Sequence, residues 1–156
     1  MGGSIYSRFG FSDVLTMFLA LNASVELYKG GVVPLAEYAQ RPYDRDILVR
    51  VLVPKENARF VYQSVRNSQT DFPVLTCAAA KLADGSIRAA IGARPGKAVL
   101  YTAAPEAGET AEEFAARFAA EVKADIKTES NLRGGAEYRR HLAGVLTKRA
   151  VCRLEG

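Results

Sequence analysis

Hydrophobic positions along the chain follow two periods, and together they predict a mixed helical and stranded structure. In the first part, Ser12 precedes an apolar run with Asp13 in its first turn, which is typical of a capped, largely buried helix over 13–21. Alternating or β-branched runs predict strands at 23–28, 32–33 and 47–53, with a helical turn at 34–39. The first ten residues contain three glycines and two serines, which predicts a loop.

The second part is expected to be α+β. Runs at 60–65, 74–82 and 87–93 predict strands, 97–102 is a further candidate, and a hairpin turn lies at 83–86. A capping box at Thr110 and Glu113 opens an amphipathic helix, and a long helix is predicted at 136–154. We expect one side of this long helix to carry Tyr138, Leu142, Val145, Leu146 and Arg149. We therefore expect a three-stranded antiparallel sheet packed on helices, after a boundary at 54–57.

Composition excludes several classes of protein. The 156 residues are 49% hydrophobic, which argues against disorder, and no apolar run reaches membrane-spanning length. No secretory signal opens the chain, and two cysteines are too few for a disulfide scaffold, so a cytoplasmic location is expected. The net charge of +4 comes from dispersed basic residues, which disfavours nucleic-acid binding.

Catalytic and metal-binding candidates are scarce. The single histidine, His141, falls within a predicted helix with no acid four residues before it, and no group of residues has metal-ligand spacing. Cys77 lies in an apolar strand and is expected to be a core residue, and Cys152 has no reactive context. We therefore predict no catalytic residue and no metal site in this chain.

The first thirteen residues do suggest a ligand. Gly2 and Gly3 would let the backbone approach a phosphate group, and the Ser4 hydroxyl would donate to it. Asp13 repels phosphate but suits hydroxyl groups, so the two features together match a nucleotide with a polyol. The alternative is that two glycines near a chain start form only a flexible end.

Several motifs in order resemble the FAD-binding subunit of molybdenum hydroxylases, the family of xanthine dehydrogenase and aerobic carbon monoxide dehydrogenase. Gly2-Gly3-Ser4-Ile5 followed by Ser12-Asp13 resembles the family's second flavin loop, and the segment 45–54 resembles the exit from the flavin domain. The segment 60–74, the turn at 84–87 and the segment 132–142 resemble the family's C-terminal domain. The resemblance implies residues 1–55 as the second part of a FAD-binding domain and 56–156 as the C-terminal domain.

The resemblance also implies site residues. Gly2, Gly3, Ser4 and Ile5 would line the FAD pyrophosphate and ribityl region, Asp13 would accept hydrogen bonds from cofactor hydroxyls, and Leu48 would pack near the flavin. This chain departs from the family pattern where Ser4 replaces the common Asn and where Phe9-Gly10-Phe11 replaces Ala-Ser-Pro. Gln63 is aligned with a lysine that some members place beside the flavin, and it is left out of the expected site.

Two functions follow from the resemblance. In the first, the chain is a partial electron-transfer subunit that passes electrons from iron–sulfur clusters to FAD and on to NAD or another acceptor. Its partners would be an iron–sulfur subunit, a molybdopterin-binding subunit and a missing N-terminal FAD half, with the chain a fragment, a truncation or the product of a split gene. The helix around Phe18 and Leu19 would then be exposed. In the second, it is a non-catalytic assembly domain without flavin binding, to which exposed Tyr138, Arg139 and Arg140 would contribute.

Overall fold

The computed structural model describes residues 1–55 and 59–155. The expected boundary between two parts at 54–57 lies partly outside the described residues. The helices are α1 (Gly2–Tyr6), α2 (Asp13–Ala20), α3 (Leu35–Gln40), α4 (Ala111–Asp125) and α5 (Ala136–Glu155). The strands are β1 (Ser24–Leu27), β2 (Gly31–Pro34), β3 (Leu48–Leu52), β4 (Arg59–Val65), β5 (Leu75–Lys81), β6 (Ile87–Gly92) and β7 (Val99–Ala103).

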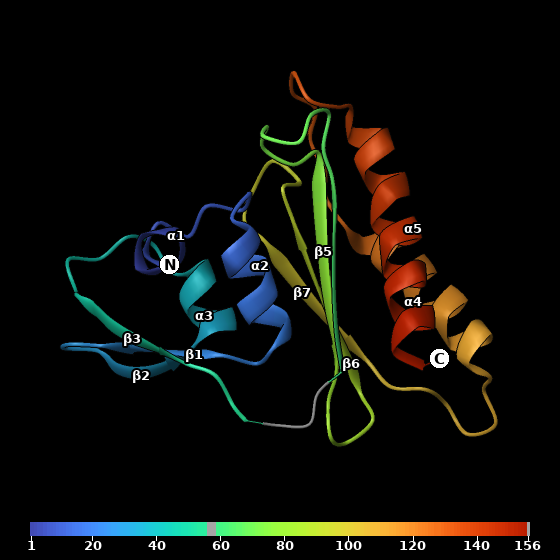
Figure 1. Cartoon of the computed structure of the whole chain (residues 1–156), viewed down its shortest axis with the longest axis horizontal. Helices are drawn as coiled ribbons and strands as arrows, with labels where there is room; N and C mark the ends of the chain where they lie inside the picture. The colour runs from blue at the N-terminus through green and yellow to red at the C-terminus, as the bar shows by residue number, and fades with distance from the viewer. Residues whose placement is uncertain (56–58, 156) are drawn as a thin grey trace.

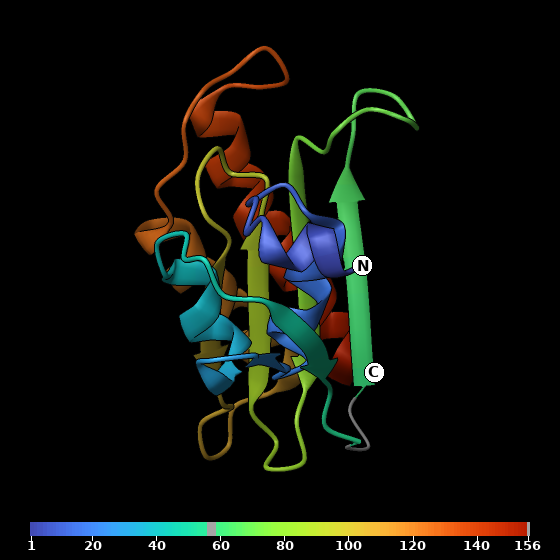
Figure 2. The same ribbon diagram turned by 90° about the vertical axis from the view of Figure 1, so that its left-hand side faces the viewer.

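A four-stranded antiparallel sheet in the order β4-β5-β6-β7 forms the middle of the molecule. Helices α4 and α5 cover one face, and the segment containing α1 to α3 covers the other (Figures 1 and 2). The α+β class is therefore confirmed, but the sheet has four strands where three were expected. The run at 97–102 supplies the additional strand, because β7 pairs with β6 from Ile87–Ala103 to Ile91–Val99.

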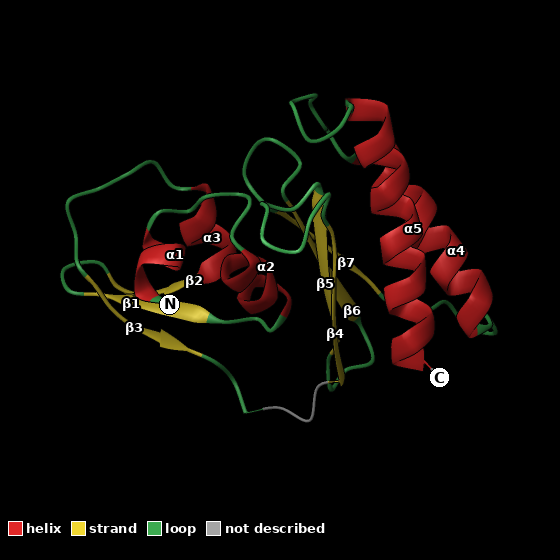
Figure 3. Ribbon diagram, turned by 45° about the horizontal axis from the view of Figure 1, so that its top comes forward, coloured by secondary structure: helices red, strands yellow, loops and turns green. Residues whose placement is uncertain are grey.

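A second, three-stranded antiparallel sheet in the order β2-β1-β3 lies at the far end of the first part. Helices α1, α2 and α3 lie between this sheet and the central one (Figure 3). Val25, Leu27 and Val33 alternate with exposed or half-buried neighbours and point toward these helices. Among the described residues, no helix is long and apolar enough to cross a membrane.

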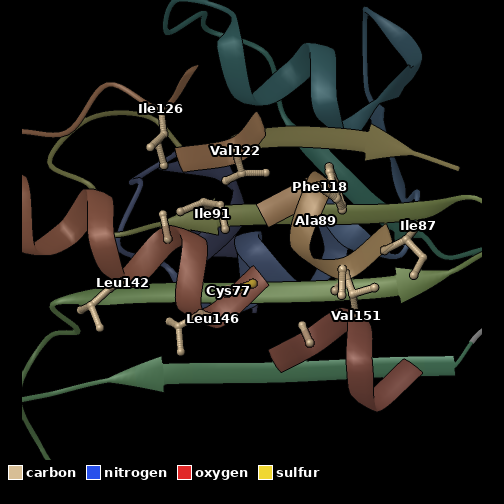
Figure 4. Close-up of a cluster of buried hydrophobic side chains, with 14 of the residues drawn as sticks. Cys77, Ile87, Ala89, Ile91, Phe118, Val122, Ile126, Leu142, Leu146 and Val151 are labelled. Carbon is tan, nitrogen blue, oxygen red and sulfur yellow. The ribbon is translucent and has the colours of Figure 1, made fainter. Parts of the chain in front are cut away.

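Strand β5 is buried on both faces, which explains its run of small residues. Cys77 and Ala79 face α4 and α5, where they pack with Ile91, Phe118 and Val151 (Figure 4). Ala78 and Ala80 face the opposite core, around α2. Burial raises the pKa of the Cys77 thiol to about 12, so the expectation of an inert core cysteine is confirmed.

The structure overturns two expectations about the first part. Residues 2–6 form a short helix and not a loop, and the Ile5 side chain is fully buried beneath it. Helix α2 is not exposed around Phe18 and Leu19, because it packs on β5 and β6 of the central sheet. Leu19 is buried, and Phe18 is half-buried against the same core. The capping of α2 is as predicted, since Ser12 Oγ accepts from the Leu15 amide at 3.2 Å.

Helix α5 buries only part of the expected side: Leu142 and Leu146 are buried, but Tyr138 and Arg149 are not. Arg139 is fully buried, whereas Tyr138 is 50% exposed and Arg149 is exposed. The Arg139 guanidinium donates to four oxygens: those of Val74 (2.9 Å), Glu129 (2.6 Å) and Gly134 (2.6 Å), and Asn131 Oδ1 (2.6 Å). Arg139 therefore joins α5 to β5 and to the preceding loop, and it is not part of an exposed docking surface.

Candidate functional site

A cleft of about 640 Å³ lies where the start of the chain meets the end of β4 and the loop that follows it. Helix α2 begins at this cleft, and Ser12, Asp13 and Val14 lie on its wall. The other lining residues are Gly3, Ser4, Ser7, Phe9, Phe11, Arg66, Thr70, Asp71, Phe72, Pro73 and Arg133. Segments about 50 residues apart in the sequence thus share one cavity.

Asp13 is held by Tyr62 in the middle of β4 and by Arg66 directly after that strand. Tyr62 Oη donates to Asp13 Oδ1 at 2.7 Å, and Arg66 Nη2 donates to Oδ2 at 2.5 Å. Burial and the hydrogen bond to Asp13 raise the pKa of the Tyr62 phenol. Burial alone would lower the pKa of the Arg66 guanidinium, but the hydrogen bond and charge of Asp13 outweigh it and raise the pKa. A carboxylate accepts about four hydrogen bonds, so Asp13 keeps acceptor capacity toward the cleft.

Gly2, Gly3 and Ser4 lie at the cleft or next to it. Gly3 and Ser4 line it, and a Cβ added to Gly2 or Gly3 would meet no atom within 4 Å. Open space therefore lies beside this backbone, as the approach of a large ligand requires. A second hollow of about 390 Å³ joins Gly2 and Gly3 to Leu48 of β3.

The structure therefore brings five of the six expected site residues together around two neighbouring hollows, which share Gly3. Ile5 is the exception, because its side chain points into the core and lines neither hollow. Among the described residues, no group of three histidines, cysteines or acids is placed to hold a metal ion.

Sequence reasoning missed the cationic side of the cleft. Gln63 was compared with a family lysine, but its amide donates to the Leu146 carbonyl of α5 at 3.2 Å, on the opposite face of the sheet. Tyr62 and Arg66 face the cleft. Side chains alternate along a strand, so positions 62 and 63 must point in opposite directions. The same alternation places position 66 on the side of Tyr62, so it could have indicated from the sequence that Arg66 faces the cleft.

Aromatic rings close one side of the cleft. Phe11 stacks with Phe9 at 5.1 Å between ring centroids and contacts Phe72 at 4.7 Å. The Arg133 guanidinium lies 5.2 Å from the Phe72 ring and bonds Asp71 Oδ1 through two nitrogens, at 3.0 and 2.7 Å. The hydrogen bonds from Arg133 lower the pKa of the Asp71 carboxyl. These contacts join the loop after β4 to the segment before α5.

Comparison with known proteins identifies the family. Residues 60–154 match the model of the CO dehydrogenase flavoprotein C-terminal domain. The chain belongs to this family. The match covers β4 to α5, which is the central sheet with its two long helices. No curated protein matches the sequence.

Solved structures share the fold over the whole chain. Quinoline 2-oxidoreductase from Pseudomonas putida 86 matches 99% of this chain at 20% identity and a TM-score of 0.79. Carbon monoxide dehydrogenase from Hydrogenophaga pseudoflava, in a form lacking the Mo-pyranopterin moiety, matches 98% at 23% identity and a TM-score of 0.81. Reconstituted CO dehydrogenase from Oligotropha carboxidovorans matches 99% at 22% identity and 0.78. The chain spans 59–60% of the length of these chains.

Proposed function

We propose that this chain supplies part of the FAD site of a molybdenum hydroxylase flavoprotein subunit. Residues 1–55 would be the second part of the FAD-binding domain, and residues 56–156 would be the C-terminal domain. The single observation that carries the proposal is the cleft in which Gly3, Ser4 and Asp13 meet Arg66 of the matched family domain. A cytoplasmic location, favoured by the two unpaired cysteines, belongs to the proposal.

The residues present fit a flavin nucleotide. Open space beside Gly2 and Gly3 would admit a pyrophosphate close to the backbone, and the exposed Ser4 hydroxyl would donate to it. Asp13 would accept from hydroxyl groups of the ribityl chain, while Leu48 offers an apolar contact in the neighbouring hollow. Arg66 is paired with Asp13, and its remaining N–H groups are donors on the cleft wall for an anionic ligand.

Bound FAD would supply the electron-transfer chemistry, accepting electrons from iron–sulfur clusters of a partner subunit and passing them to NAD or another acceptor. The chain's own residues position and shield it. Tyr62 and Arg66 fix the Asp13 carboxylate from two sides, so that its orientation does not depend on the ligand. Phe9, Phe11 and Phe72 form an apolar wall on one side of the cleft. An iron–sulfur subunit and a molybdopterin-binding subunit are the proposed partners.

Titration of the purified chain with FAD, followed by flavin fluorescence, tests the proposal. We expect saturable binding in the micromolar range that is at least tenfold weaker in both Asp13→Ala and Arg66→Gln, since each removes a charge-assisted contact. Arg140→Gln makes the same charge change as Arg66→Gln on the exposed side of α5 and should leave binding unchanged. Circular dichroism of each variant establishes that the fold is retained.

The alternative is an assembly domain that binds partner subunits without flavin. It is favoured by the ion pair between Asp13 and Arg66, because each of these charges already has a partner in the absence of a ligand. Absence of FAD binding up to millimolar concentration in the folded chain would contradict the flavin proposal for this chain and support the assembly function. Binding that is equal in all three variants would place the flavin outside the cleft.

A further inference from the structure

A second cavity, of about 560 Å³, shares a wall with the proposed FAD cleft. The common wall is the aromatic cluster of Phe9, Phe11 and Phe72. Pro73 and Arg133 also line both cavities. The lining further includes Arg8, Tyr43 and the loop after β6 with Lys97. Neither Asp13 nor Arg66 lines this cavity, so it adjoins the cleft but lacks the charged pair that we assign to FAD binding.

The aromatic residues at this cavity are unusually exposed. Phe9 is 50%, Phe72 is 53% and Tyr43 is 64% exposed, whereas aromatic side chains are more often buried. A group of exposed aromatic rings around one hollow is typical of a surface that binds an apolar or aromatic molecule. The rings offer stacking partners on the wall shared by Phe9 and Phe72.

The Arg8 guanidinium has an incomplete set of hydrogen bonds. The residue is only 4% exposed, and its Nε and Nη1 atoms are buried without an acceptor. The guanidinium stacks 4.0 Å from the centroid of the Tyr38 ring, and the carboxylate that pairs with it, Asp44, lies at a long 3.5 Å. Buried guanidinium nitrogens are almost always hydrogen-bonded, so these two donors favour an additional anionic partner.

The other two cations that line the cavity already have hydrogen-bond acceptors. Lys97 Nζ donates to the carbonyls of Gln40 and Arg41 at 2.6 and 3.0 Å, and Arg133 is paired with Asp71. Among the described residues, no carboxylate lines the cavity. A guanidinium with two donors left matches a singly charged carboxylate better than a phosphate group, which needs several donors.

The backbone at this cavity is also unusual. Arg8 and Ala93, two of the three described non-glycine residues with positive φ, line it, with φ values of 51° and 58°. The Ala93 amide donates to the Gly10 carbonyl at 2.6 Å, which holds the two strained segments together. Such conformations persist where the surrounding structure requires them, often at binding sites.

From these observations we propose that the cavity binds a small aromatic carboxylate. The carboxylate would accept from Arg8, and the ring would lie against Phe9 and Phe72. The proposal does not depend on FAD binding, since it uses a different cation and a different cavity.

The probe is 2-naphthoate, with 2-naphthamide as its neutral counterpart of the same shape. Two-dimensional amide NMR of the purified chain during titration with each molecule gives both the affinity and the location. We expect the acid to shift the amides of Ala93, Gly96 and Lys97, and to bind at least tenfold more tightly than the amide. Equal affinity of the two molecules, shifts centred on Ser4, Asp13 and Arg66, or no shifts at 10 mM would each overturn the proposal.

Two variants separate charge from fold. Arg8→Gln should reduce the affinity for the acid about tenfold and leave that for the amide unchanged. Because Arg8 also packs on Tyr38, this variant could unfold, so Phe9→Ala provides a second measurement at an exposed ring. It should weaken acid and amide by the same factor. Lys148→Gln, on the exposed side of α5, is the charge-matched control.

If folded Arg8→Gln binds the acid as the parent chain does, the site is elsewhere. Excess FAD that leaves naphthoate binding intact would show that the two sites are independent.

Discussion

Arg66 at the end of β4 donates to the Asp13 carboxylate at the first turn of α2, with 2.5 Å between Nη2 and Oδ2. The pair joins the first part of the chain to the domain that the family model matches. It also lies on the wall of the cleft that we assign to FAD. One contact therefore links the packing of the two parts with the proposed cofactor site.

A double-mutant cycle measures this link. Asp13→Asn and Arg66→Gln should each destabilise the chain, with a coupling of about 0.5–1 kcal/mol, the range for partly exposed ion pairs. Urea unfolding of both single variants and the double variant gives the value. Combining Asp13→Asn with the distant Arg140→Gln should give no coupling. A coupling near zero for Asp13 and Arg66 would mean that the pair does not contribute to joining the parts.

Arg139 should be far more important for stability than its neighbour in sequence. Arg139→Met would leave the oxygens of Val74, Glu129, Gly134 and Asn131 without their donor, at a cost of about 3 kcal/mol or more. Arg140→Met, at an exposed position, should change stability by about 0.5 kcal/mol or less. Chemical unfolding of the two variants makes the comparison, and similar values would contradict the observed burial.

Gly10 is required because two loops meet there. An added Cβ would lie 1.8 Å from the Gly96 carbonyl oxygen, and Gly96 has a φ of 144°. Gly10→Ala should therefore destabilise the chain by about 1–3 kcal/mol, because backbone must move. Gly2→Ala is the control, since its Cβ meets nothing within 4 Å. A Gly10→Ala variant as stable as the parent would show that the two loops separate at little cost.

Alkaline pH should weaken the fold through Tyr101. Burial and the hydrogen bond to Asp125 raise the pKa of Tyr101 from 10.0 to about 12. Because the pKa is higher in the folded state, the associated stability is present below about pH 10 and is lost as pH rises toward 12.

Tyr101→Phe should show a shallower decline in stability over that range, and unfolding curves at pH 9, 10 and 11 measure it. The ultraviolet absorbance of tyrosinate reports the titration directly. An identical decline in the variant would assign the effect to other groups, among them Tyr62, whose pKa is also raised.

The local sequence predicted most elements of this fold. Ser12 and the Thr110–Glu113 capping box fix helix starts through contacts within four residues, and both caps are present. Alternation of apolar residues predicted the strands, because the period of two is a property of the strand itself. The family resemblance also rested on short motifs in order, and the match over residues 60–154 confirms it.

What the sequence left open depends on partners distant along the chain. Arginine is usually a surface residue, and the burial of Arg139 is favourable only because four oxygens accept from it, among them the carbonyls of Val74 and Glu129. Phe18 and Leu19 could have been exposed or covered, and the central sheet covers them. The sequence by itself thus determined helix caps, strand periodicity and family. Only the tertiary structure decided which polar groups meet, as in the pairs of Asp13 with Arg66 and of Arg8 with Asp44. Those contacts join segments that no local pattern connects.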